Sequence, residues 1–557
     1  MNEEKYVKRN LWMYPLGTVG RDMMYALFNS FILTYILLTR NLDGAQLAAI
    51  TVIMICARVF DAVNDPIMGL IIEKTRTKWG KFKPWLAAGV LSTSGVIITI
   101  FNVTLQGWAF IAVFGVIYFL YSITYTMSDI SYWGMIPSLS SKPDTRNQFT
   151  SRAVLFAGIG STLAGMLIPM FTVGQTALMP SAQQSYGIIS IAISVLAIGF
   201  VCFSLFGIKE PNLALPVQNN AKKKSVKEIL KTIGKNKPLL WIIVAFVFQQ
   251  IGNALALGGI GSTYVYFQYG YEGGLYSLFS TIGVAATAVL MIFYPLISRK
   301  INRKPLMTIM TFVALGGYAL MALTAFSFIN NSIAGFWILT IGYMLSNLGQ
   351  YGFYLIMMIS IMNTVEYNEY MSGEREEAII TSVRPFVTKM TSAIVVGLTS
   401  LSYVIFRVTD YTNQISDLEQ QATAGAIDEA TKLAGIKEII GNIDNGQKLG
   451  LLLVMIIIPL ACMLASYFIY RKKYTLDEAE YDRICKVINE RKQSEAAETE
   501  PVQTETAENG TADAVAVSEP TDAATAKVEA VSDAAEIATV EGESDDTVSD
   551  ASQEQSK

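Results

Sequence analysis

The stretch DPIMGLIIEKTRTKWGKFKPWL, residues 65–86, joins a proline and an apolar helical turn to a basic loop and a second proline, after which the chain turns apolar again. A weaker copy, YPLISRKINRKPLM, occupies residues 294–307. Each segment is typical of the end of one apolar helix, a charged loop and the start of the next helix. Their recurrence predicts a chain built from two similar halves.

The composition around these segments is that of a membrane protein. Of 557 residues, 52% are hydrophobic and only 16% are charged, which is too apolar for an ordinary soluble protein. Twelve stretches reach the roughly 20 residues needed to cross a ~30 Å hydrocarbon layer. They are residues 12–39, 45–72, 84–104, 108–138, 150–174, 184–208, 238–268, 276–298, 305–327, 334–363, 378–408 and 449–471. The sequence therefore predicts an all-α membrane protein with twelve transmembrane helices.

Basic residues gather in alternate loops of this array. The loops KTRTKWGKFK, NNAKKKSVKEILKTIGKNK, SRKINRK and YRKKY lie on one side, whereas VTLQGW, GYEGG and FINNS on the other side carry none. Since basic loops stay in the cytoplasm, we expect an integral plasma-membrane protein with both termini on the cytoplasmic side. The longest basic loop predicts an N-terminal half at 1–208, a cytoplasmic linker at 209–237 and a C-terminal half at 238–473.

Two segments fall outside the twelve spans. An extracellular insertion at about 410–448 has helical patterning and is interpreted as a passive, solvated helix. The cytoplasmic tail at 474–557 is expected to be disordered from about 494. Residues 491–557 hold 4 basic and 17 acidic residues and no aromatic residue, so this part of the tail cannot bury enough apolar surface to offset its ordering entropy.

An acid pair, Asp61 and Asp65, lies within the second span. Each ionised aspartate at membrane depth costs about 2.5–3.5 kcal/mol on insertion scales, so the pair must face a cavity or partners. At spacing i, i+4 the two share one helical face, with Asn64 beside it. Such oxygens suit a small cation such as Na⁺, or two close carboxylates can hold a proton between them. Alternatively, Arg58 neutralises one acid and the pair has only a structural role.

A second polar group lies in the fourth span. Tyr125, Asp129 and Trp133 follow at i, i+4 and i+8 and form one stripe. A carboxylate beside an indole is how proteins commonly hold a sugar, because the acid accepts hydroxyl hydrogen bonds and the ring packs on the C–H face. Further charges in or beside the spans are Arg21, Asp22 and Arg152. Mutual pairing of Asp22, Asp129 and Arg152 is the structural alternative.

Missing residue types exclude several classes of function. The chain has no histidine, which removes the usual zinc ligands and Ser-His or Cys-His catalysis. It has neither a phosphate-binding GxxxxGK[ST] loop nor a dinucleotide fingerprint. We therefore expect no enzyme, no cofactor and no ATP-driven transport by this chain alone.

Three motifs together resemble the signature of the glycoside-pentoside-hexuronide:cation symporter family, the melibiose permease-like branch of the major facilitator superfamily. They are DAVNDPIMGLIIEKTRTKWGKFKPW at residues 61–85, TYTMSDISYWGMIP in the fourth span and TVEYNEYMSGER after the tenth. The resemblance runs to about Lys473. It implies the major facilitator fold with two six-helix halves, and symport of a sugar or glycoside with Na⁺ or H⁺.

The resemblance also implies roles for residues that match these motifs. The cation site would be Asp61, Asn64, Asp65 and Thr126, with the two aspartates as the ligands if Na⁺ is the ion. The sugar site would be Arg21, Asp22, Tyr125, Asp129, Trp133, Arg152, Tyr354 and Lys389. The cytoplasmic gate would be Glu366, Glu369 and Arg375, pairing with the basic first-half loops.

Departures from the family pattern affect the substrate. Tyr354 stands where the typical member has Trp, and Pro385 where it has a small polar residue, so specificity for α-galactosides does not carry over. A sugar-binding receptor without transport, or a same-fold transporter of another cargo such as a lipid, remain the alternatives. The expected partners are the sugar, a monovalent cation and membrane lipid, without nucleic acid, in a monomer.

Overall fold

A computed structural model describes residues 3–140, 142–209, 232–257, 259–330 and 332–499. Helices make up almost all of these residues. In the first half they are α1 (Glu3–Thr39), α2 (Gly44–Lys74), α3 (Lys83–Asn102), α4 (Gly107–Gly134), α5 (Ile136–Leu139), α6 (Pro143–Thr172) and α7 (Ala182–Gly207). The second half contains α9 (Lys237–Leu257), α10 (Gly259–Tyr269), α11 (Gly273–Lys300), α12 (Arg303–Leu323), α13 (Ser327–Asn330), α14 (Ile333–Met362), α15 (Thr364–Ser372), α16 (Glu377–Ile405), α17 (Val408–Thr423), α18 (Glu429–Gly441) and α19 (Asn445–Lys473). The helix α20 (Glu478–Thr499) follows.

Twelve spans in the described residues are long and apolar enough to cross a membrane, and the predicted count and fold class are confirmed. Three spans contain two helices each: α4 with α5, α9 with α10, and α14 with α15. The other spans each lie within one helix. Apolar length thus locates the spans correctly, because the bilayer thickness fixes it.

Short polar side chains start several of these helices. Asp43 caps α2 in a capping box with Gln46, and Asp444 caps α19 through the backbone N–H of Gly446. Such caps satisfy N–H groups that have no partner within the helix. They fix where the chain enters each helix at the end of the bundle.

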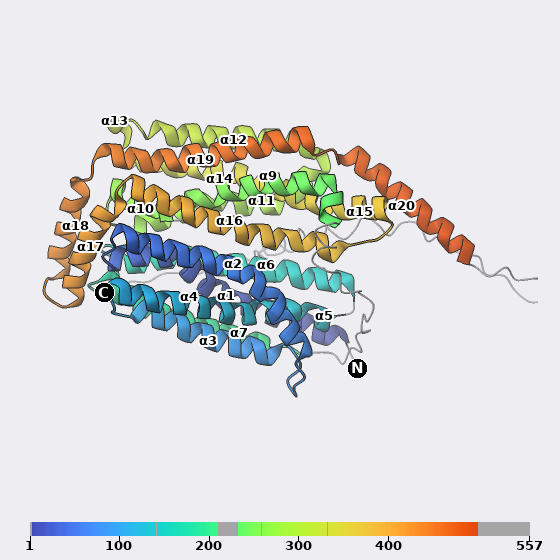
Figure 1. Cartoon of the computed structure of the whole chain (residues 1–557), viewed down its shortest axis with the longest axis horizontal. Helices are drawn as coiled ribbons and strands as arrows, with labels where there is room; N and C mark the ends of the chain where they lie inside the picture. Colours follow the sequence, from blue (N-terminus) through green and yellow to red (C-terminus); the bar gives the residue numbers. More distant parts are fainter. Residues whose placement is uncertain (1–2, 141, 210–231, 258, 331, 500–557) are drawn as a thin grey trace, which may run out of the picture.

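Each half packs mainly within itself. In the first half α1 is central and contacts α6 and α7, while α4 packs on α2 and α3. In the second half α14 packs on α11 and α12, and α9 packs on α19 and α16. The halves meet along α2 with α16 and along α6 with α11, in one elongated bundle (Figure 1).

The internal repeat explains why the acid pair has no second copy. If Pro66 corresponds to Pro295, then Asp61 and Asp65 correspond to Leu290 and Tyr294. Both of these second-half residues are buried in α11. The repeated position is therefore a packing position in the second half, and the carboxylates are specific to the first.

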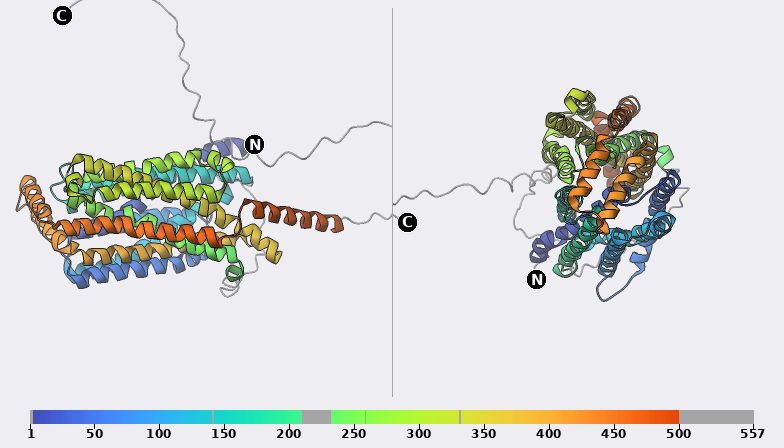
Figure 2. Two further views of the ribbon diagram at one scale, coloured as in Figure 1. Left: turned by 90° about the horizontal axis from the view of Figure 1, so that it is seen from above. Right: turned by 90° about the vertical axis from the view of Figure 1, so that its left-hand side faces the viewer.

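The helices α17 and α18, called the cap helices below, lie across one end of the bundle, called the cap end. The N-terminus and α20 lie at the opposite end (Figure 1). Viewed from the cap end, the cap helices cross the middle of the bundle (Figure 2). The expectation of a passive, solvated helix is wrong for α17, because Thr412, Ile415 and Glu419 are buried there.

Two other expected segments fall largely outside the described part of the chain. Of the linker at 209–237, residues 210–231 are not described. Of the tail, α20 is helical to Thr499, past the boundary at about 494, and residues 500–557 are not described. The described part of α20 packs against α15.

Candidate functional site

Arg21 is the centre of one polar cluster between α1 and α4. Its guanidinium lies 3.0 Å from Asp22 and 3.0 Å from Asp129, with only 2% of its side chain exposed. It also lies over the rings of Tyr132 and Trp133, at 4.7 Å and 5.4 Å from the ring centroids. The sequence alternative paired both aspartates with Arg152, whereas the structure pairs them with Arg21. One buried cation therefore holds two carboxylates and an indole together.

The Asp129 side chain stays 40% exposed despite this ion pair. On the same face of α4, Tyr125 stacks on Tyr121 with ring centroids 5.6 Å apart. Trp133 is partly buried and meets Tyr132 edge-on at 5.5 Å. A solvent-accessible carboxylate beside an indole can accept hydroxyl groups while the ring covers an apolar face.

Arg152 lies at the edge of this cluster and is not bonded to its acids. Its guanidinium donates to the backbone oxygen of Leu11 at 3.4 Å and lies 5.2 Å from the ring centroid of Trp12. Neither contact neutralises its charge. Among the described residues, Arg152 thus has no carboxylate partner.

The acid pair of α2 faces α4. Ser122 donates to Asp61, and Thr126 donates to Asp65 at 3.2 Å. Asn64 is buried, and its side-chain nitrogen has no hydrogen-bond partner among the described residues. The predicted residues Asp61, Asp65 and Thr126 therefore lie at one helix–helix contact, and Asn64 precedes Asp65 in α2.

Each acid of the pair also meets a basic side chain. Arg58 lies 4.0 Å from Asp61 on the same helix, so the structural alternative is correct for that contact. Lys389 on α16 of the second half pairs with Asp65, and these two side chains are 30% and 34% exposed. The second pair links the two halves at a site that water can reach.

Helix α4 is shared by both clusters. Ser122 and Thr126 contact the acid pair, while Asp129 and Trp133 belong to the Arg21 cluster. The four positions cover about three helical turns. A ligand that moves this helix at one cluster must therefore affect the other.

Three further polar residues at or near these clusters were not predicted from the sequence. The role of Ser122 could not be recognised from the sequence, because it is one of several hydroxyl side chains in the fourth span. Asn29 accepts from Arg58 at 2.5 Å and donates to Tyr121 at 2.8 Å, and so positions that arginine. Arg384 on α16 donates to the hydroxyl of Tyr354 at 3.0 Å. Its position one residue before Pro385 was the available signal.

Arg384 lies outside the stripe of exposed apolar residues on α16. At 100° per residue, this stripe spans about 100° of the helix surface, and Arg384 lies about 60° beyond its edge at Ile405. The exposed residues are Phe386, Ile394, Leu401, Val404 and Ile405. Tyr354, the partner of Arg384, packs near Phe246 and Tyr351. Arg384 and Tyr354 thus form a polar pair on the second-half side.

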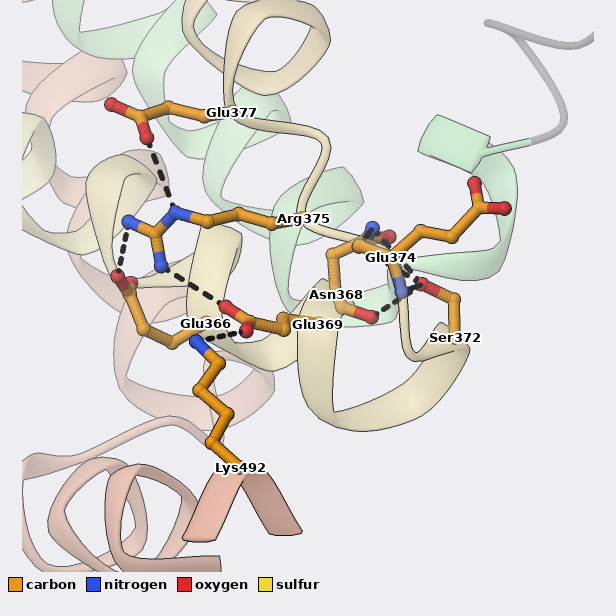
Figure 3. A network of polar contacts seen from close by, with 8 residues as sticks. All are labelled: Glu366, Asn368, Glu369, Ser372, Glu374, Arg375, Glu377 and Lys492. Carbon is orange, nitrogen blue, oxygen red and sulfur yellow. Dashed lines mark hydrogen bonds and ion pairs between the residues drawn. The ribbon is translucent and has the colours of Figure 1, made fainter. Parts of the chain in front are cut away.

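The predicted gate residues gather in one network (Figure 3), beside α15 at the end opposite the cap (Figure 1). Arg375 meets Glu366 at 3.1 Å, Glu369 at 3.0 Å and Glu377 at 3.3 Å. Lys492 of α20 also meets Glu369, at 2.6 Å. The structure brings the three predicted residues together, but the described partners are all in the second half or α20, and none is in a first-half loop.

The described residues contain no group of three or more His, Cys, Asp or Glu side chains placed to hold a metal ion. The acid pair alone offers two carboxylates, with one hydroxyl bonded to each. This donor set matches a monovalent cation or a proton better than a tightly held divalent metal.

Known proteins resemble the chain over most of its length. A sequence model of the family described as "MFS/sugar transport protein" matches residues 13–478. A lactose permease of Leuconostoc lactis is 28% identical over 405 residues, covering 69% of this chain and 61% of the relative. A lactose permease of Lactobacillus helveticus is 25% identical over 494 residues, covering 85% and 71%. The match thus spans less than two thirds of the Leuconostoc protein.

A solved structure resembles the fold as well. A D-xylose-proton symporter superposes with a TM-score of 0.53 at 13% identity, and the alignment covers 84% of this chain and 99% of that chain. At this identity the likeness concerns the fold alone. Together with the twelve apolar helices, these comparisons identify an integral membrane protein.

Proposed function

Since the chain belongs to the MFS/sugar transport protein family, we propose that it is a symporter that imports a sugar or glycoside with a monovalent cation, Na⁺ or H⁺. The observation that carries this proposal is the sharing of α4 between two clusters. One cluster has the acid, indole and arginine that suit a sugar, and the other has the oxygens that suit a cation. Symport needs such adjacency, because each ligand must favour binding of the other.

The proposed sugar ligands in the first half are the Arg21 cluster and its neighbours: Arg21, Asp22, Tyr125, Asp129, Trp133 and Arg152. Arg21 fixes both aspartates through its ion pairs, and Asp129 keeps an accessible oxygen for hydroxyl groups. The proposed second-half wall is Tyr354 with Arg384. Sugar bound between these walls would contact both halves.

The proposed cation ligands are Asp61, Asn64, Asp65 and Thr126. In this arrangement the ammonium of Lys389 already pairs with Asp65. A coupling cation at Asp65 would compete with that ammonium, because both need the same carboxylate. Cation binding would therefore loosen a contact between the halves, which is what coupling to movement requires.

We place the basic loops, both termini and α20 in the cytoplasm, by the positive-inside rule, and the cap end outside. Hydrogen bonds between described residues join the halves from the cap end as far as the Lys389–Asp65 pair. This distribution supports an inward-facing arrangement. Glu366, Glu369 and Arg375 would then meet the first-half loops only when the cytoplasmic end closes.

Purified protein in sealed proteoliposomes tests the proposal. Labelled mono- and disaccharides are offered with an inward Na⁺ gradient, an inward H⁺ gradient or neither. We expect gradient-driven accumulation of at least one sugar, and counterflow of that sugar without a gradient. Asp129→Asn protein in matched vesicles is the control for leakage. Sugar binding without counterflow would identify a receptor instead, and a lack of binding by any sugar would point to another cargo.

A further inference from the structure

The cap helix α17 is joined to the second half but is hydrogen-bonded to the first. Asn413 accepts from the backbone N–H of Leu42 at 2.9 Å, and its amide donates to the Leu42 oxygen at 3.0 Å. One turn further on, Asp417 accepts from Asn41 at 2.6 Å. These contacts attach one face of α17 to the connection between α1 and α2.

A buried ion pair makes a second attachment. Glu419 on α17 and Lys432 on α18 lie 3.4 Å apart, and each side chain is 1% exposed. Glu419 accepts from the backbone N–H of Ala182 at 2.6 Å, and Lys432 donates to the oxygen of Pro180 at 2.5 Å. Tyr271 also donates to Glu419 at 2.9 Å. The pair therefore bonds to the first half at the start of α7 and to the second half through Tyr271.

The link between α16 and the cap is short and constrained. Only Phe406 and Arg407 separate α16 from α17, and Arg407 has a φ of 52°, in the left-handed region that non-glycine residues seldom adopt. Movement of α16 is thus transmitted to α17 rather than absorbed in a long loop. If the halves rock apart at the cap end, the bonds of α17 to the first half must break.

We propose that α17 is an outer latch: its Asn413, Asp417 and Glu419 contacts hold the cap end closed, and their release limits opening to the outside. The proposal rests on the alternating movement in the proposed function. It assigns a mechanical role to the insertion between the last two spans. A buried ion pair is weak evidence for stability in itself, since desolvation offsets its Coulomb energy. This pair matters because it bonds to both halves at the cap end, so opening there must break some of its bonds.

Reversible cross-linking tests whether the latch must release. In a background with the four free cysteines replaced by serine, Asn41→Cys with Asp417→Cys joins the cap to the first half through a short bis-thiosulfonate. Leu418→Cys with Gly435→Cys is the matched control, because it joins only the two cap helices, which touch at these positions. Uptake is measured in proteoliposomes before cross-linking, after it, and after reduction.

We expect the first cross-link to abolish uptake and counterflow, reduction to restore them, and the control cross-link to leave them unchanged. Uptake at the full rate with a complete 41–417 cross-link overturns the latch. An absence of uptake in both uncross-linked pairs and in their cysteine-free parent counts against the proposed function instead. The two failures are therefore distinguishable.

Loosening the latch gives an independent measurement. Asn413→Ala removes two neutral hydrogen bonds without leaving a buried charge, whereas Gln414→Ala removes a side chain whose hydrogen bond among the described residues lies within α17. The reporter is Ser262→Cys, because Ser262 is buried and lies 3.2 Å from Thr34 across the halves. We expect Asn413→Ala to speed labelling by an impermeant thiol reagent up to about tenfold, and Gln414→Ala to leave it unchanged. Equal labelling rates in both variants overturn the proposal.

Discussion

Asp129 and Asp65 lie on different helices and have different cationic partners, Arg21 and Lys389. No hydrogen bond or ion pair between described residues joins the two acids or their partners. The two carboxylates can therefore be neutralised separately. Their proposed roles are testable by single substitutions, because Asp129 on α4 and Asp65 on α2 are held by different cations.

For Asp129→Asn we expect sugar affinity to fall about 10- to 100-fold, the change expected when hydrogen bonds to a charged group are lost. Protection of the protein by the cation against thermal unfolding should persist. Asp65→Asn should do the reverse, removing cation dependence and sparing downhill sugar exchange. Sugar binding by calorimetry and cation-dependent thermal protection are the two measurements. Loss of both responses in each variant, with folding intact, would contradict the separate assignment.

Arg384→Gln tests the second-half wall. Arg384 bonds to Tyr354 outside the exposed apolar stripe of α16. We therefore expect Arg384→Gln to raise the sugar concentration that gives half-maximal uptake roughly tenfold, with a smaller change in maximal rate. Arg471→Gln is the matched control, since Arg471 also donates to a tyrosine hydroxyl, that of Tyr467, on α19. An equal effect of both substitutions would mean that Arg384 acts only on stability.

The residues of the site were predictable to different extents. Asp61, Asp65 and Asp129 stand out because ionised groups in apolar spans are costly and need a reason. Their partners do not stand out: Lys389 and Asp65 are 324 residues apart, and no local periodicity relates them. Motif resemblance identified Lys389, but Ser122 and Arg384 match no motif. Only the folded chain shows their contacts.

At the scale of helices, the spans were predictable and the cap was not. Apolar length is set by the membrane, so hydropathy finds a span directly. The buried face of α17 is only half apolar, because Thr412, Ser416 and Glu419 lie there beside Val408, Ile415 and Ala422. Hydropathy assigns such a face to solvent, because it does not register the hydrogen bonds that make its burial tolerable.

The helix α20 is attached through acids at its start. Asp477 lies 3.3 Å from Lys304, and Glu478 lies 2.9 Å from Arg303 and accepts from its backbone N–H. The backbone N–H of Glu480 lowers the pKa of Asp477. Burial alone would raise the pKa of Glu478, but hydrogen bonds from Arg303 lower it overall. Folded-state pKa values below the ordinary range mean that both acids stabilise the docked helix when ionised.

This attachment predicts a loss of order in acid. The stabilisation is complete above the ordinary carboxyl pKa of about 4 and is lost as the pH falls through the lowered values. We expect hydrogen-exchange protection of α20 to be higher at pH 6 than at pH 3, after correction for the intrinsic rate. Asp477→Asn with Glu478→Gln should give low protection at both pH values. A pH response in that double variant equal to the wild type would contradict the assignment.

For the whole molecule, the acid pair constrains stoichiometry. It occurs once, since its second-half counterparts are Leu290 and Tyr294, and one cation per sugar is the expected ratio. One charge crossing 100 mV supplies about 2.3 kcal/mol, and a tenfold ion gradient adds about 1.4 kcal/mol. Together they sustain roughly 500-fold sugar accumulation.

Paired flux measurements test this ratio. Labelled sugar and labelled Na⁺, or a pH dye if protons couple, are followed in one proteoliposome sample, and we expect equal fluxes with net inward charge for a neutral sugar. The Asp65→Asn protein measures the uncoupled background. A reproducible ratio of two cations per sugar would require a second cation site outside the acid pair.

The central place of α1 has a consequence for biosynthesis. In its most apolar stretch 78% of the residues are buried, against 22–56% in the other spans, and its buried Arg21 and Arg40 suit protein contacts rather than lipid. Yet α1 leaves the ribosome before its partners α6 and α7, which are complete only some 170 residues later, roughly 10–30 s at ordinary elongation rates. We therefore expect the insertion machinery to shield α1 from lipid until α6 and α7 have been synthesised.

A fragment of residues 1–140 should therefore be degraded within minutes of synthesis, while residues 1–209, which include α6 and α7, should persist without the second half. Pulse-chase labelling of the two fragments in cells compares their lifetimes, with the full chain as the reference. Equal lifetimes for both fragments would mean that α1 is stable in lipid without its partners. Survival of the longer fragment alone would make the sixth span the point at which the first half becomes a folded unit during translation.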